Sequence, residues 1–252
     1  MVVDYLSKNV AMVLVRPRFP ENIGSAARAM CNMGFYNLIV VAPENPDKDR
    51  IFKLSTHAAA GVVEQMAVFD SLETALAPFN LVVGTTARLG RQRSVIGSPE
   101  KLAQKLVPLA TENRVAVLFG PEDRGLSNAD IRFCHWLMNI PTAKFASLNL
   151  AQAVMIVCYA LFNSVQAPTQ KSVPRLASRQ ELDGMYAKLS EILVRIDYIK
   201  ADNADYWMNR VRHFGTRMQL QARDVNIIRG ICRQINWYGN KRYQDGNDKK
   251  GA

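Results

Sequence analysis

Residues 9–34 read NVAMVLVRPRFPENIGSAARAMCNMG, and this stretch decides the fold class. It opens with a short apolar run rich in valine, which predicts a buried strand over residues 9–15. Apolar residues then recur at helical spacing, at Ile23, Ala26, Ala27, Met30 and Met33. Asn22 is a candidate N-cap for this helix, and Gly34 stands where a glycine commonly ends one. A strand followed by an amphipathic helix is the unit from which parallel sheets are built.

The same alternation continues to residue 163. Four more apolar runs predict strands, over residues 37–42, 80–85, 114–120 and 136–140. Ser71 opens a second helix, and Ser98, which is followed by a proline, opens a third. Residues 148–162 are nearly all apolar and predict a buried helix. Residues 1–163 are therefore predicted to form an α/β domain, in which helices flank a parallel sheet.

A second, helical part follows this domain. Residues 164–175 are polar and rich in proline, which predicts a linker. Apolar residues at helical spacing predict helices over residues 182–196 and 225–231. We therefore expect a small helical domain over residues 176–252, of which residues 238–252 form a frayed tail.

Positive charge is concentrated in the second part. Residues 171–252 hold 16 Lys+Arg and 9 Asp+Glu, a net +7, whereas residues 1–170 hold 16 and 13, a net +3. The whole chain has 252 residues, is 48% hydrophobic and carries +10 at neutral pH. This balance predicts a globular protein with a polyanionic partner, such as nucleic acid or an anionic membrane.

Several common cofactor and membrane signals are missing. No Gly-x-Gly-x-x-Gly follows the first strand and no P-loop is present, which removes the commonest nucleotide cofactors. The three histidines lie far apart, so no metal site is expected, and Cys134 beside His135 is interpreted as packing at a helix end. The four scattered cysteines predict reduced thiols, and no apolar stretch matches a bilayer span. We expect a cytoplasmic protein without a membrane anchor.

Three segments that follow predicted strands are candidates for the functional site, because ligands bind at the carboxyl ends of the strands of such sheets. They are NIGSAARAM at residues 22–30, FGPEDRGLS at residues 119–127 and SLNLAQAV at residues 147–154. In this order and spacing they resemble the three signature motifs of the SPOUT superfamily, in its 2′-O-ribose methyltransferase branch. The FGxExxGL and SLNLA strings and the helical appendage are similar to the bacterial tRNA (cytidine/uridine-2′-O)-methyltransferases of the anticodon loop.

The resemblance covers residues 8–163 and implies more than the strand pattern predicts. It implies S-adenosylmethionine as cofactor, held in loops that form a deep trefoil knot, although threaded loops are otherwise essentially absent from proteins. It also implies a homodimer with active sites across its interface, for which the helix over residues 148–162 is a natural element. The expected partner is RNA, most of all tRNA, and not DNA. The implied cofactor contacts are Thr85, Thr86, Ala87, Gly120, Ile140, Ala146, Ser147, Leu148 and Asn149.

Arg28 resembles the catalytic arginine of that family. A guanidinium stays protonated at neutral pH, so Arg28 is expected to fix a phosphate and steady the developing alkoxide, not to act as a base. In a homodimer it can serve the cofactor of the partner. A solvent-facing helix arginine is the alternative, but the alanines at positions 26, 27 and 29 leave room for a close partner.

Four other residues of the motifs are catalytic candidates. Asn22 can contact the ribose or cap its helix, and Glu122 can hold Arg28, hold a loop, or be a surface acid. Ser147 and Asn149 can touch the cofactor carboxylate or the nucleophile, or cap the helix that follows. Gly120 allows close backbone approach to a ligand, although it and Gly125 can simply serve turns. Position 121 departs from the family, because a proline stands where relatives have a basic residue.

Two groups of arginines are candidate RNA contacts. Arg88, Arg91 and Arg93 crowd the loop after a predicted strand. In the second part, arginines that include Arg210, Arg212 and Arg217 alternate with aromatic residues, which suits phosphate contacts and base stacking. The loop arginines can instead be solvated, and the aromatic residues can instead be the core of the small domain.

Three other functions are left open by the sequence. The first is methylation of ribosomal RNA. The second is a non-catalytic RNA-binding or ribosome-assembly factor that keeps the fold for its shape. The third, a nucleotide-dependent oxidoreductase, is disfavoured by the missing glycine fingerprint.

Overall fold

The structure, a computed structural model, describes residues 3–87, 95–143, 148–164 and 173–248. The chain divides into two compact units, Met1–Pro174 and Arg175–Ala252. Among the described residues, none of the helices combines the length and the apolar character that crossing a bilayer demands.

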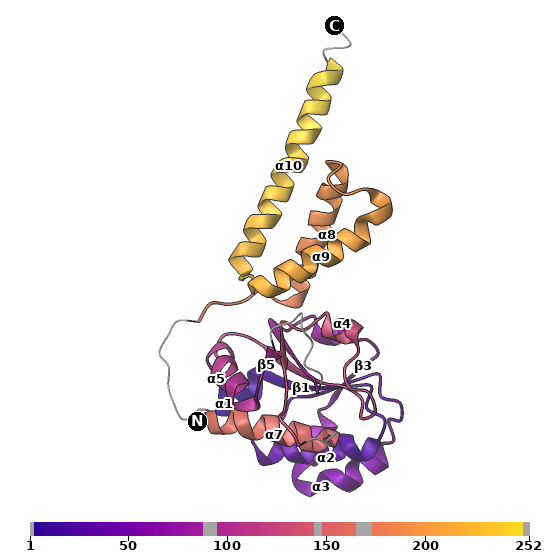
Figure 1. Cartoon of the computed structure of the whole chain (residues 1–252), viewed down its shortest axis with the longest axis vertical. Helices are drawn as coiled ribbons and strands as arrows, with labels where there is room; N and C mark the ends of the chain where they lie inside the picture. The colour runs from indigo at the N-terminus through magenta and orange to yellow at the C-terminus, as the bar shows by residue number, and fades with distance from the viewer. Residues whose placement is uncertain (1–2, 88–94, 144–147, 165–172, 249–252) are drawn as a thin grey trace. The chain divides into compact units, whose positions relative to one another are not determined.

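A sheet of seven parallel strands forms the centre of the first unit, in the order β3-β2-β1-β6-β4-β7-β5 (Figure 1). The strands are β1 Val10–Val15, β2 Leu38–Val41, β3 Ala67–Phe69, β4 Leu81–Thr85, β5 Val95–Ile96, β6 Val115–Phe119 and β7 Trp136–Met138. The five predicted strands are confirmed. The two that the sequence did not predict, β3 and β5, are short and lie at the two edges of the sheet.

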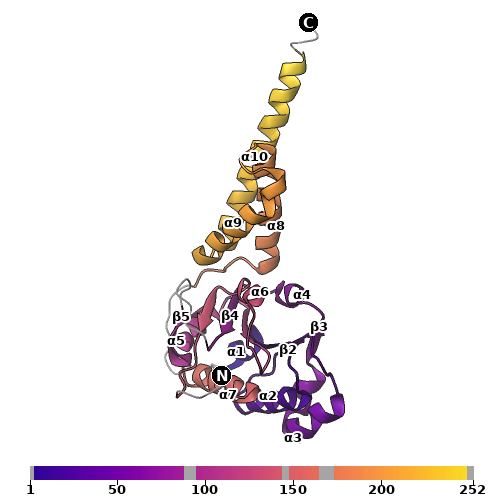
Figure 2. The same ribbon diagram turned by 45° about the vertical axis from the view of Figure 1, so that its right-hand side comes forward.

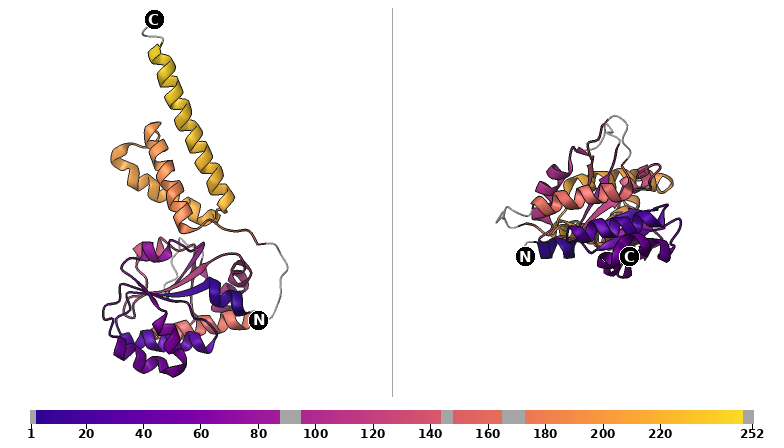
Figure 3. Two further views of the ribbon diagram at one scale, coloured as in Figure 1. Left: turned by 180° about the vertical axis from the view of Figure 1, so that it is seen from behind. Right: turned by 90° about the horizontal axis from the view of Figure 1, so that it is seen from below.

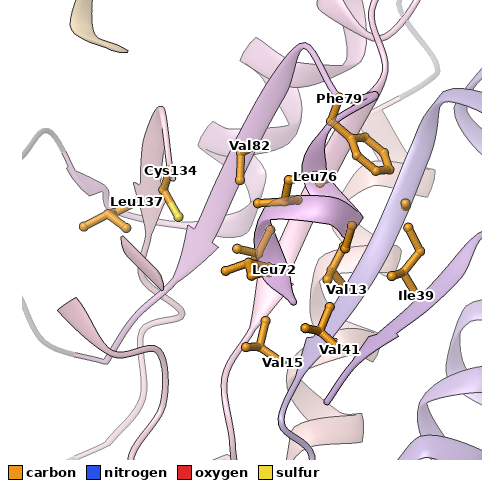
Figure 4. Packing of buried hydrophobic residues seen from close by; sticks show 14 residues of the cluster. Val13, Val15, Ile39, Val41, Leu72, Leu76, Phe79, Val82, Cys134 and Leu137 are labelled. Atoms are coloured by element: carbon orange, nitrogen blue, oxygen red, sulfur yellow. The ribbon is translucent and has the colours of Figure 1, made fainter. Parts of the chain in front are cut away.

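Helices cover both faces of this sheet. They are α1 Val3–Asn9, α2 Pro20–Asn32, α3 Lys48–Glu64, α4 Leu72–Leu76, α5 Pro99–Leu109, α6 Asn128–Ile131 and α7 Leu150–Asn163. On one face, Leu72 and Leu76 of α4 pack with Phe79 against Val13 and Val15 of β1. Figure 4 shows this cluster, with Ile39, Val41 and Val82 of the neighbouring strands beside it. Coverage on both faces explains why the inner strands read as unbroken apolar runs.

Most predicted helix ends are confirmed. The side chains of Ser71 and Ser98 cap α4 and α5 by accepting hydrogen bonds from Thr74 N and Lys101 N. Gly34 follows the end of α2 with a φ of 75°, which a glycine adopts without strain. The prediction that Asn22 is an N-cap is wrong. The helix begins at Pro20, because proline is well suited to the first helical position, and Asn22 lies in the first turn.

Helices α2, α3 and α7 form one layer under the sheet. In the right-hand panel of Figure 3, α7 and α2 run alongside each other. Helices α2 and α3 approach closely at Gly24, where an added Cβ would lie 2.1 Å from the carbonyl oxygen of Ile51. This contact requires glycine, since backbone on one side meets backbone on the other.

The second unit is built from three long helices around a small apolar core. They are α8 Arg179–Arg195, α9 Ala204–Met218 and α10 Ala222–Asp248, with a 3-10 turn η2 Ala201–Asn203 before α9. Leu182, Met185 and Tyr186 of α8 pack with Met208 and Val225. Figure 2 shows α10 running beyond the ends of α8 and α9.

Two further predictions, a frayed C-terminal tail and a trefoil knot, have different outcomes. The frayed tail is wrong for residues 238–248, which belong to α10. A helix that is already nucleated gains one hydrogen bond for each further residue that it fixes, and the ammonium of Lys241 lies 5.1 Å from the ring centroid of Trp237 one turn away. The trefoil knot stays a prediction, because residues 88–94 and 144–147 of the loops concerned lie outside the described residues.

Candidate active site

A crevice opens at the carboxyl ends of β1 and β6. These strands are neighbours, but the chain leaves β1 toward β2 on one side and leaves β6 toward β7 on the other. Diverging connections of this kind create a binding crevice in open α/β sheets. A cavity of about 620 Å³ lies there, lined by Phe19, Glu21, Asn22, Arg50, Glu122, Leu148 and Asn149. All three motif segments therefore contribute to one cavity.

Hydrogen bonds join the three segments to one another. The Nδ2 of Asn22 donates to Oε1 of Glu122 at 2.6 Å, and the Nδ2 of Asn149 donates to Oδ1 of Asn22 at 2.9 Å. The other carboxylate oxygen of Glu122 accepts from the backbone N of Arg18 at 3.0 Å. The ends of β1 and β6 and the start of α7 are thus linked by hydrogen bonds between side chains that are 100 and 127 residues apart in the sequence.

The orientation of both amides in this network is determined by their partners. The Glu122 oxygen accepts this hydrogen bond, so the atom of Asn22 that faces it is the amide nitrogen. Asn149 accepts from the backbone N of Ala151 through its Oδ1, which leaves its nitrogen for Asn22. One N–H of each amide is not used by these bonds. The cavity is therefore lined by two fixed amide groups with hydrogen-bonding capacity for a ligand.

The network decides between alternatives for two of its members. Within one chain, Glu122 holds Asn22 and the loop after β1. Asn149 is the N-cap of α7, in a capping box with Gln152. Asn149 therefore has a structural role and also lines the cavity. Ser147, the other motif residue of this corner, lies outside the described residues.

Arg28 is not in the cavity. It is an exposed side chain on α2, and it takes no part in the hydrogen bonds that join Asn22, Glu122 and Asn149. The neighbouring Ala26, Ala27 and Ala29 are buried, with at most 5% of each exposed. They allow α2 to pack closely on its own unit, and the role expected of Arg28 stays a prediction.

The loops expected to hold a cofactor meet at the same edge of the sheet. Strand β4 lies between β6 and β7, and Thr85 at its end donates through Oγ1 to the carbonyl of Leu118 at 2.9 Å. The backbone N of Thr86 donates to the carbonyl of Met138 at 2.9 Å, and Asn139 Nδ2 donates back to the carbonyl of Thr86 at 2.9 Å. These bonds place Thr85 and Thr86 beside Leu118 and Met138, which precede Gly120 and Ile140 by two residues each. Ala87 is exposed beside them, and Ala146 lies outside the described residues.

Gly120 is required by the fold of its loop. A Cβ at this position would lie 2.2 Å from the backbone of both Gly125 and Leu126. Gly125 itself has a φ of 68°, so it also needs the freedom of glycine. Both glycines thus shape the turn that presents Glu122.

A partly buried ion pair at the end of β1 was not predicted from the sequence. Arg16, at the end of β1, donates to Asp130, which is 4% exposed and forms a capping box with Ser127 at the start of α6. Burial alone raises the pKa of the Asp130 carboxyl, but hydrogen bonds from Arg16 and Ser127 outweigh it and hold the pKa below its usual range. The spacing of Ser127 and Asp130 is a capping signal that the sequence already carries.

Three residues on the cavity wall were also missed. Phe19 is 49% exposed, and Glu21 accepts from Arg50 at 2.7 Å from Nε and 2.6 Å from Nη2. Phe19 and Glu21 follow a strand directly, so the strand-end rule was able to find them. The same rule does not find Arg50, because this residue comes from α3, a helix that the apolar pattern did not predict.

The second unit exposes a basic and aromatic face on α9. The guanidinium of Arg210 lies 5.0 Å from the ring centroid of Tyr206 and 5.7 Å from that of Trp207. Phe214 and Arg217 on the same helix are exposed. Arg212 differs, since it is half-buried and lies over the ring of Tyr186 in the core. Trp207, Phe214 and Trp237 are each more than 40% exposed, so they are not the core of the small domain. Arg88, Arg91 and Arg93 lie outside the described residues.

Comparisons with known proteins match both units. A family model described as the SpoU rRNA Methylase family matches residues 9–159, and one described as tRNA methyltransferase TrmJ, C-terminal domain, matches residues 180–248. The chain is 32% identical over 240 residues to the tRNA (cytidine/uridine-2′-O-)-methyltransferase TrmJ of Photorhabdus laumondii, a match that covers 93% of this chain and 99% of that protein.

Two further matches extend this result. The tRNA (cytidine/uridine/adenosine-2′-O-)-methyltransferase TrmJ of Pseudomonas aeruginosa is 33% identical over 237 residues, which covers 88% of this chain and 91% of the relative. The crystal structure of TrmJ from Z. mobilis ZM4 matches with a TM-score of 0.76 at 30% identity, covering 90% of this chain and 98% of that one.

Proposed function

Because this chain belongs to the TrmJ tRNA 2′-O-methyltransferases of the SpoU methylase family, we propose that it methylates the ribose 2′-hydroxyl of a cytidine or uridine in the tRNA anticodon loop. One observation carries the proposal. Hydrogen bonds join Asn22, Glu122 and Asn149 in one cavity at the carboxyl ends of the strands. The four cysteines form no disulfide with one another in the described structure, which suits the cytoplasmic location that is part of the proposal.

The proposed cofactor is S-adenosylmethionine, which supplies the methyl group from a positively charged sulfur. The residues that would hold it are Thr85, Thr86, Ala87, Gly120, Ile140, Ala146, Ser147, Leu148 and Asn149. Those that the structure describes are uncharged, so they offer backbone amides to an adenine and place no cation beside a sulfonium. This chemistry fits the proposed group.

Alignment of the nucleophile is the proposed role of the two amides. The unused N–H groups of Asn22 and Asn149 can hold the oxygens of one ribose, while Glu122 keeps the Asn22 amide in its plane. Holding a weak nucleophile in line with the methyl group is itself a large part of catalysis, because it replaces an encounter in solution by a fixed geometry.

Arg28 is proposed to act in the active site of a partner subunit. It is exposed on α2, and on the adjacent helix α7 the side chains of Tyr159 and Phe162 are 56% and 42% exposed. Large apolar side chains exposed together on one helix suit a homodimer contact. Across such a contact the guanidinium reaches the crevice of the partner subunit. There it binds a phosphate of the RNA and stabilises the ribose 2′-oxygen as that oxygen becomes negative.

The second unit is proposed to hold the tRNA. The exposed α9 face offers Arg210 and Arg217 for phosphates and Trp207 and Phe214 for unpaired bases. Arg88, Arg91 and Arg93 are proposed to meet phosphates nearer the methylated nucleotide, and Arg212, half-buried over Tyr186, to steady the α9 face.

Replacing both Arg210 and Arg217 by glutamine is expected to weaken tRNA binding about tenfold or more and to reduce the salt slope of binding by about 2. Affinity for S-adenosylmethionine is expected to stay unchanged. Filter binding over a salt series measures the slope. The matched control is Lys188→Gln, which removes a cation that already pairs with Glu191 at 2.9 Å. An unchanged salt slope in the double variant contradicts this role for α9.

The function itself is tested by incubating the purified protein with S-adenosylmethionine and either tRNA or ribosomal RNA, followed by mass spectrometry of the nucleosides. The expected product is 2′-O-methylcytidine or 2′-O-methyluridine in anticodon-loop fragments of tRNA. Product in ribosomal RNA alone would establish the alternative substrate. Absence of both product and calorimetric binding of S-adenosylmethionine would favour a non-catalytic RNA-binding protein.

A further inference from the structure

The wall of the cavity carries an exposed aromatic ring. Phe19 is the residue before α2, and 49% of it is exposed although it lies in a concave surface. The guanidinium carbon of Arg18 lies over the ring, 5.8 Å from its centroid. Burying a phenylalanine side chain removes apolar surface from water, so an exposed one in a cavity is a favourable contact surface for a ligand.

A fixed guanidinium lies on the same cavity. Arg50 donates to Glu21 through both Nε and Nη2, and its own backbone N donates to Asp47, the N-cap of α3. The contact with Glu21 uses two of the five N–H groups of the guanidinium. The remaining donors belong to a group that is held in place at both ends.

We infer that this cavity binds the base of the nucleotide that is methylated, with Phe19 as its stacking face and Arg50 as a donor to the carbonyl O2 of a pyrimidine. The inference rests on the proposed function. The base and the 2′-hydroxyl are carried by neighbouring carbons of one ribose. A 2′-hydroxyl held by Asn22 and Asn149 therefore brings its base into the cavity that these residues line together with Phe19 and Arg50.

The donor chemistry suits the base edge that would face it. The minor-groove edge of a nucleotide lies on the side of the 2′-hydroxyl. Cytosine and uracil both present the O2 acceptor on that edge, while their amino and carbonyl groups at C4 lie on the other. A guanidinium that donates to O2 therefore binds either pyrimidine, and stacking on Phe19 does not distinguish the two bases either. Guanine carries an amino donor beside its N3 acceptor on that edge, and a guanidinium repels this amino group.

A phosphate is a poorer occupant of the same place. The charge of Arg50 is already offset by Glu21, and Glu122 adds a second carboxylate to the cavity lining. An uncharged base meets no such repulsion. The aromatic ring of Phe19 and the apolar side chain of Leu148 likewise suit a flat heterocycle and not an ion.

Photo-crosslinking tests this inference without relying on activity. Anticodon stem-loops that carry 5-iodouridine at each loop pyrimidine in turn are irradiated with the full-length protein, and the crosslinked peptide is identified by mass spectrometry. We expect one position to crosslink to Phe19, and Phe19→Leu to lower the yield at least fivefold. The control is Tyr36→Leu. This substitution removes a ring that is 51% exposed and lies just before β2, at the amino ends of the strands and not at their carboxyl ends, where the cavity lies. Crosslinks that map only to other peptides, or an undiminished yield in Phe19→Leu, overturn the inference.

Kinetics separate this inference from the proposed function. Phe19→Leu and Arg50→Gln are each expected to raise the KM for the stem-loop by about tenfold, as loss of one stacked or hydrogen-bonded base contact does, with the Kd for S-adenosylmethionine unchanged. If the wild-type protein methylates RNA and both variants keep its KM, the inference fails and the proposed function stands. If the crosslink to Phe19 forms but no RNA is methylated, the base site stands and the proposed function fails.

Discussion

Arg28→Ala is expected to lower the kcat for tRNA methylation by about 10²–10³ or more, which is the loss seen when one donor to a developing negative charge is removed. Affinity for S-adenosylmethionine is expected to stay within about threefold, because Arg28 does not line the cavity of its own chain. Single-turnover assays and calorimetry measure the two quantities. Arg28→Lys keeps the charge but loses the planar fork, so we expect it to recover only part of the rate. Asn32→Ala, at another exposed position of α2, is the control that must stay active.

The same substitution decides whether Arg28 acts across a subunit interface. Arg28→Ala and Asn149→Ala are each expected to be inactive as homodimers. In a randomly mixed sample half of the dimers contain one chain of each kind, and one of their two sites combines an intact Asn149 with an intact Arg28. Mixing should therefore restore about one quarter of the wild-type rate if the site is shared, and nothing if it is not. Sedimentation of the wild-type protein tests the proposed dimer, and sedimentation of each variant shows whether it keeps the same oligomeric state.

Gly120→Ala is expected to destabilise the first unit by about 1–3 kcal/mol and to weaken S-adenosylmethionine binding by more than tenfold. The new methyl group would lie 2.2 Å from the backbone of Gly125 and Leu126, and backbone cannot rotate away as the end of a side chain can. The turn must open, and Glu122 moves with it. Urea unfolding followed by tryptophan fluorescence and calorimetric titration measure the two effects.

Gly61→Ala provides the matched comparison. Gly61 lies in α3 with nothing within 4 Å of an added Cβ, so alanine there should stabilise the helix by roughly 0.5–1 kcal/mol. Cofactor affinity should not change. If Gly120→Ala behaves like Gly61→Ala in both assays, the turn after β6 is not the constraint that its geometry indicates.

The fold was predictable wherever burial produces a recognisable run of apolar residues in the sequence. Strands β1, β2, β4 and β6 are covered on both faces, so each reads as an apolar run. The edge strand β3 has two exposed residues of three, and no run distinguishes it from a loop. The end of α10 was missed because its stability comes from the helix already formed before it and not from its own composition. The family comparisons confirm the resemblance that the three motifs carried.

The site was predictable as a set of segments but not as a set of contacts. The rule that ligands bind after strands placed Asn22, Glu122 and Asn149 at one edge. It did not reveal that Asn22 lies between the other two, since this depends on the neighbouring places of β1 and β6, strands that are far apart in the sequence. Arg50 was not predicted because only the close approach of α3 to α2 at Gly24 brings it to the cavity.

The hydrogen bond between Asn149 and Asn22 also links the two sides of the reaction. Asn149 stands at the corner of the loops proposed for the methyl donor, and Asn22 stands at the wall proposed for the ribose. If binding of the methyl donor favours this hydrogen bond, it changes the free energy with which RNA binds, and the same holds for RNA acting on the methyl donor. Thermodynamic reciprocity then requires the two changes in affinity to be equal, so methyl donor and RNA would each report whether the other is present.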